Sequence, residues 1–222
     1  LIDTGNGTKW EEKYKQIYDI NTDQYNIEKS LGKYGFSSEQ ITDVICTHMH
    51  FDHIGGNTKI KFGEVVPTFP NAKYWISEEN WNLANHPSQK DAGSFIEHDW
   101  KVLAENQMIE IIDGREPFIE GMETFVTHGH TPGLLHPVVS DGSNKLFYGA
   151  DIFPMVAHIP IPWVMAYDVQ PVVTMEEKQK LLQKMEREDW ILFFEHDPHI
   201  QACTVYKAVS YTHLRAHETM EY

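Results

Sequence analysis

The sequence of 222 residues is poor in cysteine and contains no long apolar run. Cys46 and Cys203 are too few for a disulfide framework, so we interpret them as buried small apolar residues, which also fits a reducing compartment. No uninterrupted apolar run approaches the ~18 residues that are needed to cross a bilayer. The sequence therefore excludes an integral membrane protein.

Basic residues are scarce as well. The chain has 18 Lys and Arg residues against 33 Asp and Glu residues, which gives a formal net charge of −15. A surface that follows phosphates needs the opposite charge, so nucleic acid is not expected as a partner. Hydrophobic residues make up 41% of the chain and charged residues 23%, which is typical of one folded domain rather than of a disordered chain.

Both ends of the sequence are unusual. The opening "LIDTG" reads as the end of a buried strand, which predicts that the first strands of the fold are missing and leaves any signal peptide unseen. We expect a cytoplasmic protein. The segment 210–222, "SYTHLRAHETMEY", has no clear helix or strand period and is interpreted as a non-native or disordered tail. The predicted domain is therefore 1–209.

Between the ends, short apolar runs alternate with amphipathic stretches, which predicts an α/β fold with sheets covered by helices. Helices are expected over 25–36, 77–86 and 95–107, and from Thr174, whose spacing to Glu177 resembles a capping box. Ser37 and Gln40 form another capping-box pattern. Strands are expected at these segments: "DVICT", "AKYWI", "MIEII", "METFVT", "KLFYGAD" and "WILFFEHDP".

Four of the predicted strands end in residues that can bind metal. "CTHMHFDHIGG" follows one strand, "HGHTPG" another, and the strands "KLFYGAD" and "WILFFEHDP" carry an Asp and a His at their ends. Loops at strand ends are the usual place for chemistry in such folds. Because this placement recurs four times, we predict a metal site with these ligands: His48, His50, Asp52, His53, His130, Asp151 and His196.

The spacing predicts two ions rather than one. His48 and His50 are two apart on an extended segment and project to the same side, whereas Asp52 and His53 follow a turn. Gly55 and Gly56 are expected to let the backbone pass closely. We therefore expect His48, His50 and His130 at one ion, and Asp52, His53 and His196 at the other, bridged by Asp151. Imidazole and carboxylate suit zinc best, with manganese, iron or cobalt as alternatives.

The motif H-x-H-x-D-H, followed by H-T-P-G, a lone Asp after a strand and a late His, resembles the metallo-β-lactamase superfamily over nearly the whole chain to about Thr204. The resemblance implies a four-layer αβ/βα sandwich with a dinuclear site. It also implies that Asp3 of "DTG" supports the ligand loop, the alternative being a turn-forming Asp. Asp151 argues against true β-lactamases, which generally lack the bridging carboxylate.

The segment "DIFPMVAHIPIPWVMAYD" and the following "FFEHDP" look like the quorum-quenching N-acyl-homoserine lactonase-like branch. Three prolines make residues 152–167 a loop, whose apolar side chains are expected to form a wall for an acyl chain or a contact in a homodimer. Lactonases of known type place a Tyr where this chain has Pro154, so His158 or Tyr167 is expected to contact the substrate. Leu134 stands where the family commonly has His, with His136 two positions later.

The resemblance implies a hydrolase that opens a lactone ring with a metal-bridging hydroxide, with Asp52 shuttling the proton. The expected substrate is a small-molecule ester or lactone of the N-acyl-homoserine type. The alternative is a methyl parathion hydrolase-like phosphotriesterase or another esterase of the superfamily, for which Phe153, Trp163 and Tyr167 would line an aromatic pocket.

Overall fold

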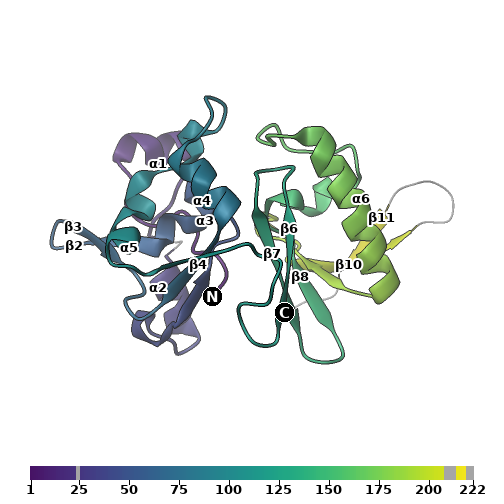
Figure 1. Ribbon diagram of the computed structural model, residues 1–222, viewed down its shortest axis with the longest axis horizontal. Coiled ribbons are helices and arrows are strands. Elements are labelled where there is room, and N and C mark those ends of the chain that lie inside the picture. Colours follow the sequence, from purple (N-terminus) through teal and green to yellow (C-terminus); the bar gives the residue numbers. More distant parts are fainter. Residues whose placement is uncertain (24–25, 208–213, 219–222) are drawn as a thin grey trace. The chain divides into compact units, whose positions relative to one another are not determined.

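The computed structural model of the chain describes residues 1–23, 26–207 and 214–218 (Figure 1). These residues form two compact units, unit 1 with Leu1–Ile112 and unit 2 with Asp113–Tyr222. None of the helices in the described ranges is both long enough and apolar enough to cross a membrane.

Unit 1 is built on a three-stranded parallel sheet in the order β1-β4-β5, with a separate β2–β3 hairpin. Buried side chains such as Val44, Tyr74 and Leu103 form its core. The strands are β1 (Asp43–Ile45), β2 (Thr58–Lys61), β3 (Glu64–Pro67), β4 (Lys73–Ser77) and β5 (Ile109–Ile112). The α-helices are α1 (Glu12–Tyr18), α2 (Ile27–Lys33), α3 (Phe51–Ile54), α4 (Glu78–Asn85) and α5 (Lys101–Glu105).

Local sequence signals place several of these elements correctly. The capping box at Ser37 is confirmed before the short helix η1 (Ser38–Gln40), and Ser77 accepts a hydrogen bond from the backbone N–H of Asn80 to cap α4. The helix expected over 95–107 is wrong in extent. It consists of one turn, η4 (Glu97–Asp99), followed by α5, because Trp100 between them has a non-helical φ of −135°.

Unit 2 is a six-stranded sheet in the order β11-β10-β9-β8-β7-β6. Its pairings are antiparallel except for the parallel pair β8–β9. Helix α6 (Pro171–Glu188) packs on this sheet through buried Leu181, Leu182 and Met185. The strands are β6 (Met122–Thr127), β7 (Leu134–Ser140), β8 (Lys145–Tyr148), β9 (Ile191–Phe193), β10 (Ala202–Lys207) and β11 (Leu214–Glu218).

Unit 2 differs from the sequence analysis in several features, among them the strands β7 and β10, which the sequence analysis did not assign. Helix α6 begins at Pro171, not at Thr174, because proline suits the first turn of a helix and Thr174 lies inside it. The backbone of Leu214–Glu218 pairs with β10, although the sequence assigned no strand there. The rest of the predicted tail, residues 210–213 and 219–222, lies outside the described residues.

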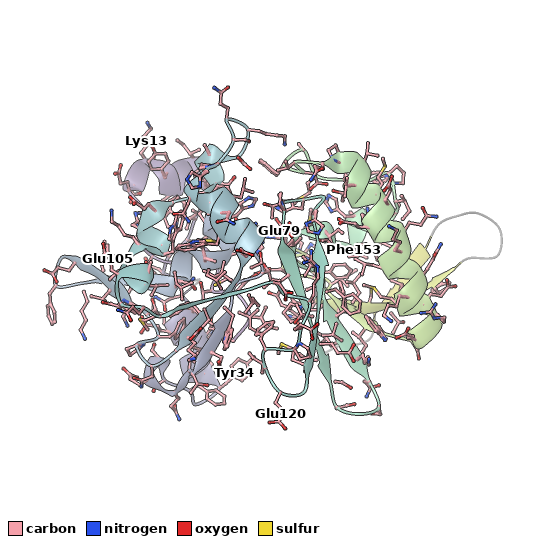
Figure 2. All side chains as sticks on the ribbon, viewed as in Figure 1. Lys13, Tyr34, Glu79, Glu105, Glu120 and Phe153 are labelled. Atoms are coloured by element: carbon pink, nitrogen blue, oxygen red, sulfur yellow. The ribbon has the colours of Figure 1, made fainter. Side chains whose placement is uncertain are left out.

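Figure 2 draws the side chains on the ribbon and labels Tyr34 and Phe153. Phe153 is fully buried, whereas Tyr34, within the helix expected over 25–36, is 81% exposed. Tyr34 follows the last residue of α2 and does not contribute to its packing.

The glycines after the ligand cluster meet the neighbouring backbone, as expected. A Cβ on Gly56 would collide with the carbonyl oxygen of Thr4, and one on Gly55 with that of Asn6. We expect Gly56→Ala to lower the free energy of unfolding by roughly 2 kcal/mol or more, since neither backbone can move without breaking its hydrogen bonds. Gly32→Ala, in the open interior of α2, is the control and should raise stability by up to about 1 kcal/mol in chemical denaturation. Equal effects would contradict the close approach.

Candidate metal centre

The first group of candidate ligands lies in unit 1, directly after β1. His48 and His53 are fully buried, and His50 is the residue that precedes the first turn of α3. His48 Nε2 lies 3.0 Å from His50 Nδ1, and His53 Nε2 lies 3.7 Å from an oxygen of Asp52. The extended segment thus places one pair of donors together, and the turn into α3 places the next pair together, as the spacing predicts.

Asp3 forms hydrogen bonds with the segment that carries this group. Its carboxylate accepts hydrogen bonds from the backbone N–H of Thr47 at 2.7 Å, from the Thr47 hydroxyl at 2.6 Å and from His53 Nδ1 at 3.0 Å. Thr47 Oγ1 lies 3.0 Å from His48 Nδ1. Because Nδ1 of His53 is directed to Asp3 and Nδ1 of His48 to Thr47, Nε2 is the nitrogen of each ring that can bind metal. This geometry agrees with the supporting role that the resemblance implies for Asp3.

The second group lies in unit 2, at the ends of β6, β8 and β9. Asp151 is 5% exposed, and its two oxygens face different histidines. Oδ2 lies 3.2 Å from His130 Nε2, and Oδ1 lies 2.9 Å from His196 Nε2. A carboxylate that presents one oxygen to each of two ligand histidines is arranged as a bridge.

Asp168 is a supporting residue that the sequence analysis missed. It lies at the end of the proline-rich loop, is 3% exposed, and accepts a hydrogen bond of 2.9 Å from His130 Nδ1. His130 is therefore oriented in the same way as His53, by a buried carboxylate on its Nδ1. The sequence offered one signal for Asp168, an Asp at the end of an apolar loop. That signal does not identify its partner His130, which is 38 residues away.

The backbone around His130 is fixed by Glu177. Its two carboxylate oxygens accept hydrogen bonds from the backbone N–H groups of His128 at 2.8 Å and Gly129 at 2.9 Å. Glu177 therefore does not cap α6, as its spacing to Thr174 predicts, but anchors the loop that carries His130.

His136 connects the strands that carry His130 and Asp151. It lies on β7, between β6 and β8, and its ring nitrogens reach the Thr127 hydroxyl at 2.7 Å and the Tyr148 carbonyl at 3.1 Å. Because a carbonyl only accepts, Nδ1 carries the proton and Nε2 accepts from Thr127. Burial lowers the pKa of His136 to about 4, so it is neutral at pH 7.

The loop after Asp151 is clamped by Lys178. This buried lysine of α6 donates hydrogen bonds to the carbonyls of Pro160 at 2.8 Å and Trp163 at 2.7 Å, and Phe153 packs beneath it at 5.8 Å from its Nζ. Burial lowers the pKa of Lys178 to about 8. The expectation of a loop over 152–167 is confirmed, whereas Phe153 cannot line an open pocket because it is fully buried.

The two other predicted catalytic residues also lie on or beside this loop. His158 is half-buried in a short turn, and its Nδ1 makes no hydrogen bond within the described part of the chain. Burial, and then the charge of Lys178, lower the pKa of His158. Tyr167 is 73% exposed. Tyr167 therefore presents most of its side chain to solvent, whereas His158 is only partly accessible.

These donors fit divalent metal ions. Two nitrogens bound to one tetrahedral zinc at about 2.0–2.1 Å lie roughly 3.3 Å apart, close to the 3.0 Å between His48 Nε2 and His50 Nδ1. Imidazole nitrogens whose other nitrogen is held by a carboxylate are the usual ligand arrangement for such ions. Each unit therefore carries a set of oriented metal donors.

We expect Asp168→Ala to weaken Zn²⁺ binding by about 10- to 100-fold, because His130 loses the acceptor that orients it. Asp168→Asn keeps one acceptor oxygen and should lose less affinity. Competition with a chromophoric chelator measures both, with Asp189→Asn, at the end of α6, as the control. Unchanged affinity in Asp168→Ala would refute the supporting role.

The neutral state of buried His136 predicts a pH dependence of stability. Its folded pKa of about 4 lies below the ordinary 6.5, so the unfolded chain binds the extra proton first as the pH falls. The stabilisation is complete above pH 6.5 and is lost as the pH falls towards 4, by about 3 kcal/mol at most. In metal-free buffer, His136→Gln should have a shallower dependence of unfolding free energy on pH over this range than the unaltered chain. Parallel curves would contradict the assignment.

The comparisons with known proteins identify the family of the chain. A family model described as the metallo-beta-lactamase superfamily matches residues 1–196, a range that contains all seven predicted ligands. The N-acyl homoserine lactonase AiiA of Bacillus thuringiensis subsp. kurstaki is 24% identical over 185 residues, which are 82% of this chain and 66% of the relative. The chain thus spans just under two thirds of the length of the curated relatives that it matches.

Solved structures show the same fold. AidC, a dizinc quorum-quenching lactonase, superposes with a TM-score of 0.78 at 22% identity, covering 100% of this chain and 76% of AidC. A probable metal-dependent hydrolase from Staphylococcus aureus gives a TM-score of 0.82 at 24% identity, covering 99% of this chain and 78% of that one. The predicted fold class is confirmed, and the chain belongs to the metallo-β-lactamase superfamily.

Proposed function

We propose that the chain is a metal-dependent hydrolase that opens the ring of an N-acyl-homoserine lactone or a similar lactone. The observation that carries the proposal is Asp151, whose two oxygens face His130 and His196 separately. A bridging carboxylate of this kind separates the lactonase-like branch from true β-lactamases. The matched curated relatives are N-acyl homoserine lactonases, which supports the same choice.

We assign the ligands as the sequence analysis does. His48, His50 and His130 would hold one divalent ion, Asp52, His53 and His196 the other, and Asp151 both. Zinc suits the imidazole-rich donor set best. When bound, the ions supply Lewis acidity towards the lactone carbonyl and lower the pKa of a water molecule.

The chain's own residues supply orientation and proton transfer. Asp3 and Asp168 hold the Nδ1 atoms of His53 and His130, so that these rings keep one position through the reaction. The Asp52 carboxylate is partly exposed, with a side chain 31% accessible. It can take a proton from the attacking water and return it to the ring oxygen as the acyl C–O bond breaks.

Lactonases of known type have a substrate-contacting tyrosine at the position of Pro154. In this chain His158 or Tyr167 would contact the lactone carbonyl instead. Pro154 is held by its carbonyl oxygen, which accepts a hydrogen bond from the backbone N–H of His196 at 3.1 Å. The loop that begins at Asp151 is thus tied to the segment of another predicted ligand. The clamp by Lys178 restrains the same loop further along.

A phosphotriesterase is the alternative because Trp163 and Tyr167 of the loop are 62% and 73% exposed and could contact an aryl leaving group. The two reactions share the metal ligands but differ in the substrate, so a substrate panel separates them.

We expect the zinc-loaded chain to hydrolyse N-acyl-homoserine lactones with a kcat/KM at least tenfold higher than for paraoxon-type phosphotriesters or a β-lactam. Asp151→Ala should reduce lactone hydrolysis at least 1000-fold, because the bridge between the ions is lost. Asp141→Ala, in an exposed turn of unit 2, is the control. A preference for phosphotriesters, or full lactonase activity in Asp151→Ala, would overturn the proposal.

A further inference from the structure

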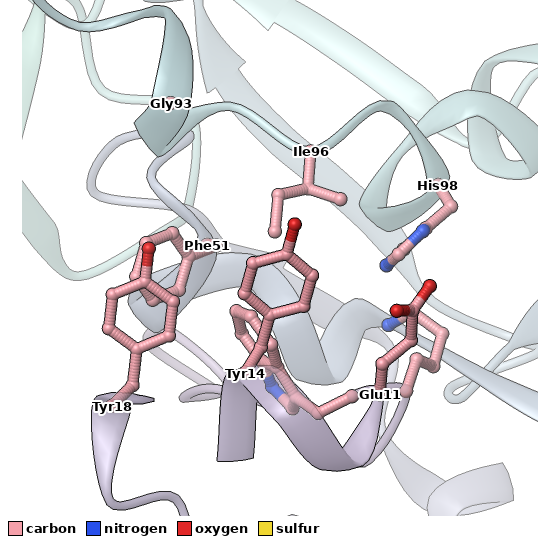
Figure 3. Close-up of a pocket in the computed structure, with 9 residues that line it drawn as sticks. Glu11, Tyr14, Tyr18, Phe51, Gly93, Ile96 and His98 are labelled. Atoms are coloured by element: carbon pink, nitrogen blue, oxygen red, sulfur yellow. The ribbon is translucent and has the colours of Figure 1, made fainter. Parts of the chain in front are cut away.

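Unit 1 contains an open pocket that the mechanism above does not use. Its volume is about 440 Å³, within the range of about 300–1,000 Å³ that is typical of sites for small molecules. Helix α1 and the segment before it form one side (Figure 3). The lining residues are Lys9, Trp10, Glu11, Tyr14, Tyr18, Phe51, Gly93, Ile96 and His98.

Four of the lining residues are aromatic: Trp10, Tyr14, Tyr18 and Phe51. Tyr14 and Tyr18, one helical turn apart on α1, have nearly parallel planes at 14°, with centroids 6.3 Å apart. Figure 3 shows these two rings side by side with Phe51 next to Tyr18. The Trp10 ring packs edge-on against the Phe51 ring, with centroids 5.1 Å apart. Because Tyr14 and Tyr18 are 40% and 50% exposed, this flat wall is open to a ligand.

The pocket adjoins the candidate metal ligands of the same unit. Phe51 stands in the sequence between His50 and Asp52, so its ring fixes one boundary of the pocket at the ligand loop. Phe95, which lies between the lining residues Gly93 and Ile96 in the sequence, packs against the His50 ring at 5.0 Å. A group in the pocket therefore lies beside the segment that carries the predicted ligands.

One lining residue, Glu11, is acidic, which disfavours an anion in the pocket. Lys9 is matched by Asp99 at 2.9 Å and also donates to the carbonyl oxygens of Gly55 and Thr58, so its charge is not offered to an anion. Burial lowers the pKa of His98, which is therefore neutral at pH 7. Lys13 lies over the Tyr14 ring at 5.6 Å and opposes a second cation on that ring.

We propose that this pocket binds a neutral, planar aryl group, and that the substrates of the chain are lactones or esters with an aryl-containing acyl group. The statement about substrates rests on the proposed function. Flat aromatic walls favour a planar ring through stacked and edge-on contacts, which a flexible alkyl chain cannot make. A straight acyl chain of similar length fills the same volume but also loses more conformational freedom on binding.

Binding is measured first, with the zinc-loaded chain and three small probes that carry no lactone: two neutral amides and one cation. Ligand titrations followed by NMR compare phenylacetamide, hexanamide and tetramethylammonium. Phenylacetamide should bind at least fivefold more tightly than the other two probes. Tighter binding of hexanamide or of tetramethylammonium would overturn the proposal without any altered protein.

Variants then locate the site. Tyr14→Leu/Tyr18→Leu should raise the Kd for phenylacetamide at least fivefold, whereas Tyr14→Phe/Tyr18→Phe, which keeps both rings, should change it less than twofold. Tyr34→Leu, an exposed tyrosine of unit 1 outside the pocket, is the matched control. Equal affinity in the Leu and Phe variants would refute the site.

Hydrolysis distinguishes this proposal from the proposed function. The ratio of kcat/KM for phenylacetyl- over hexanoyl-homoserine lactone should exceed one and fall at least fivefold in the Leu variant. Turnover of neither lactone, with ring-dependent binding of phenylacetamide, would refute the lactonase proposal and leave the aryl pocket supported. Turnover of both with an unchanged ratio would refute the pocket's role in substrate choice.

Discussion

The hydrogen bond between a buried carboxylate and the Nδ1 atom of a histidine is the interaction on which both ligand groups depend. In unit 1 it joins Asp3 to His53, and in unit 2 it joins Asp168 to His130. A buried carboxylate is costly unless it is paired, so each Asp favours the position of the histidine that donates to it. The pair thereby fixes which ring nitrogen can meet a metal ion, and the direction from which it does so.

The surrounding structure keeps these pairs aligned. Close backbone contact at Gly56 holds the segment of Asp3 against the ligand loop, and Glu177 holds the backbone before His130. His136 ties the strands that end at His130 and Asp151, while Lys178 restrains the loop between Asp151 and Asp168. Rigid ligands and a restrained neighbouring loop suit a site in which ligand positions are set before substrate arrives.

Residues whose role follows from local sequence could be predicted, and residues whose role depends on distant partners could not. Strand-end placement identified the candidate ligands, and the capping residue Ser77 needed only its neighbours. Asp168 and Glu177 act on segments 38 and 48 or more residues away, which no spacing rule reveals. The helix α1, with its tyrosines, was missed because none of its residues is buried, so it does not show the pattern of a core helix. Burial of Phe153 likewise depends on Lys178, which is distant in sequence.

The central proposal is that the seven predicted ligands hold two metal ions and that Asp151 binds both. Electron paramagnetic resonance of the chain loaded with Mn²⁺ tests it most directly, because two ions joined by a carboxylate are magnetically coupled. The account predicts two ions per chain with a coupled spectrum, and loss of the coupling in Asp151→Ala. One ion per chain, or two ions with the spectrum of isolated Mn²⁺ in the unaltered protein, would contradict it.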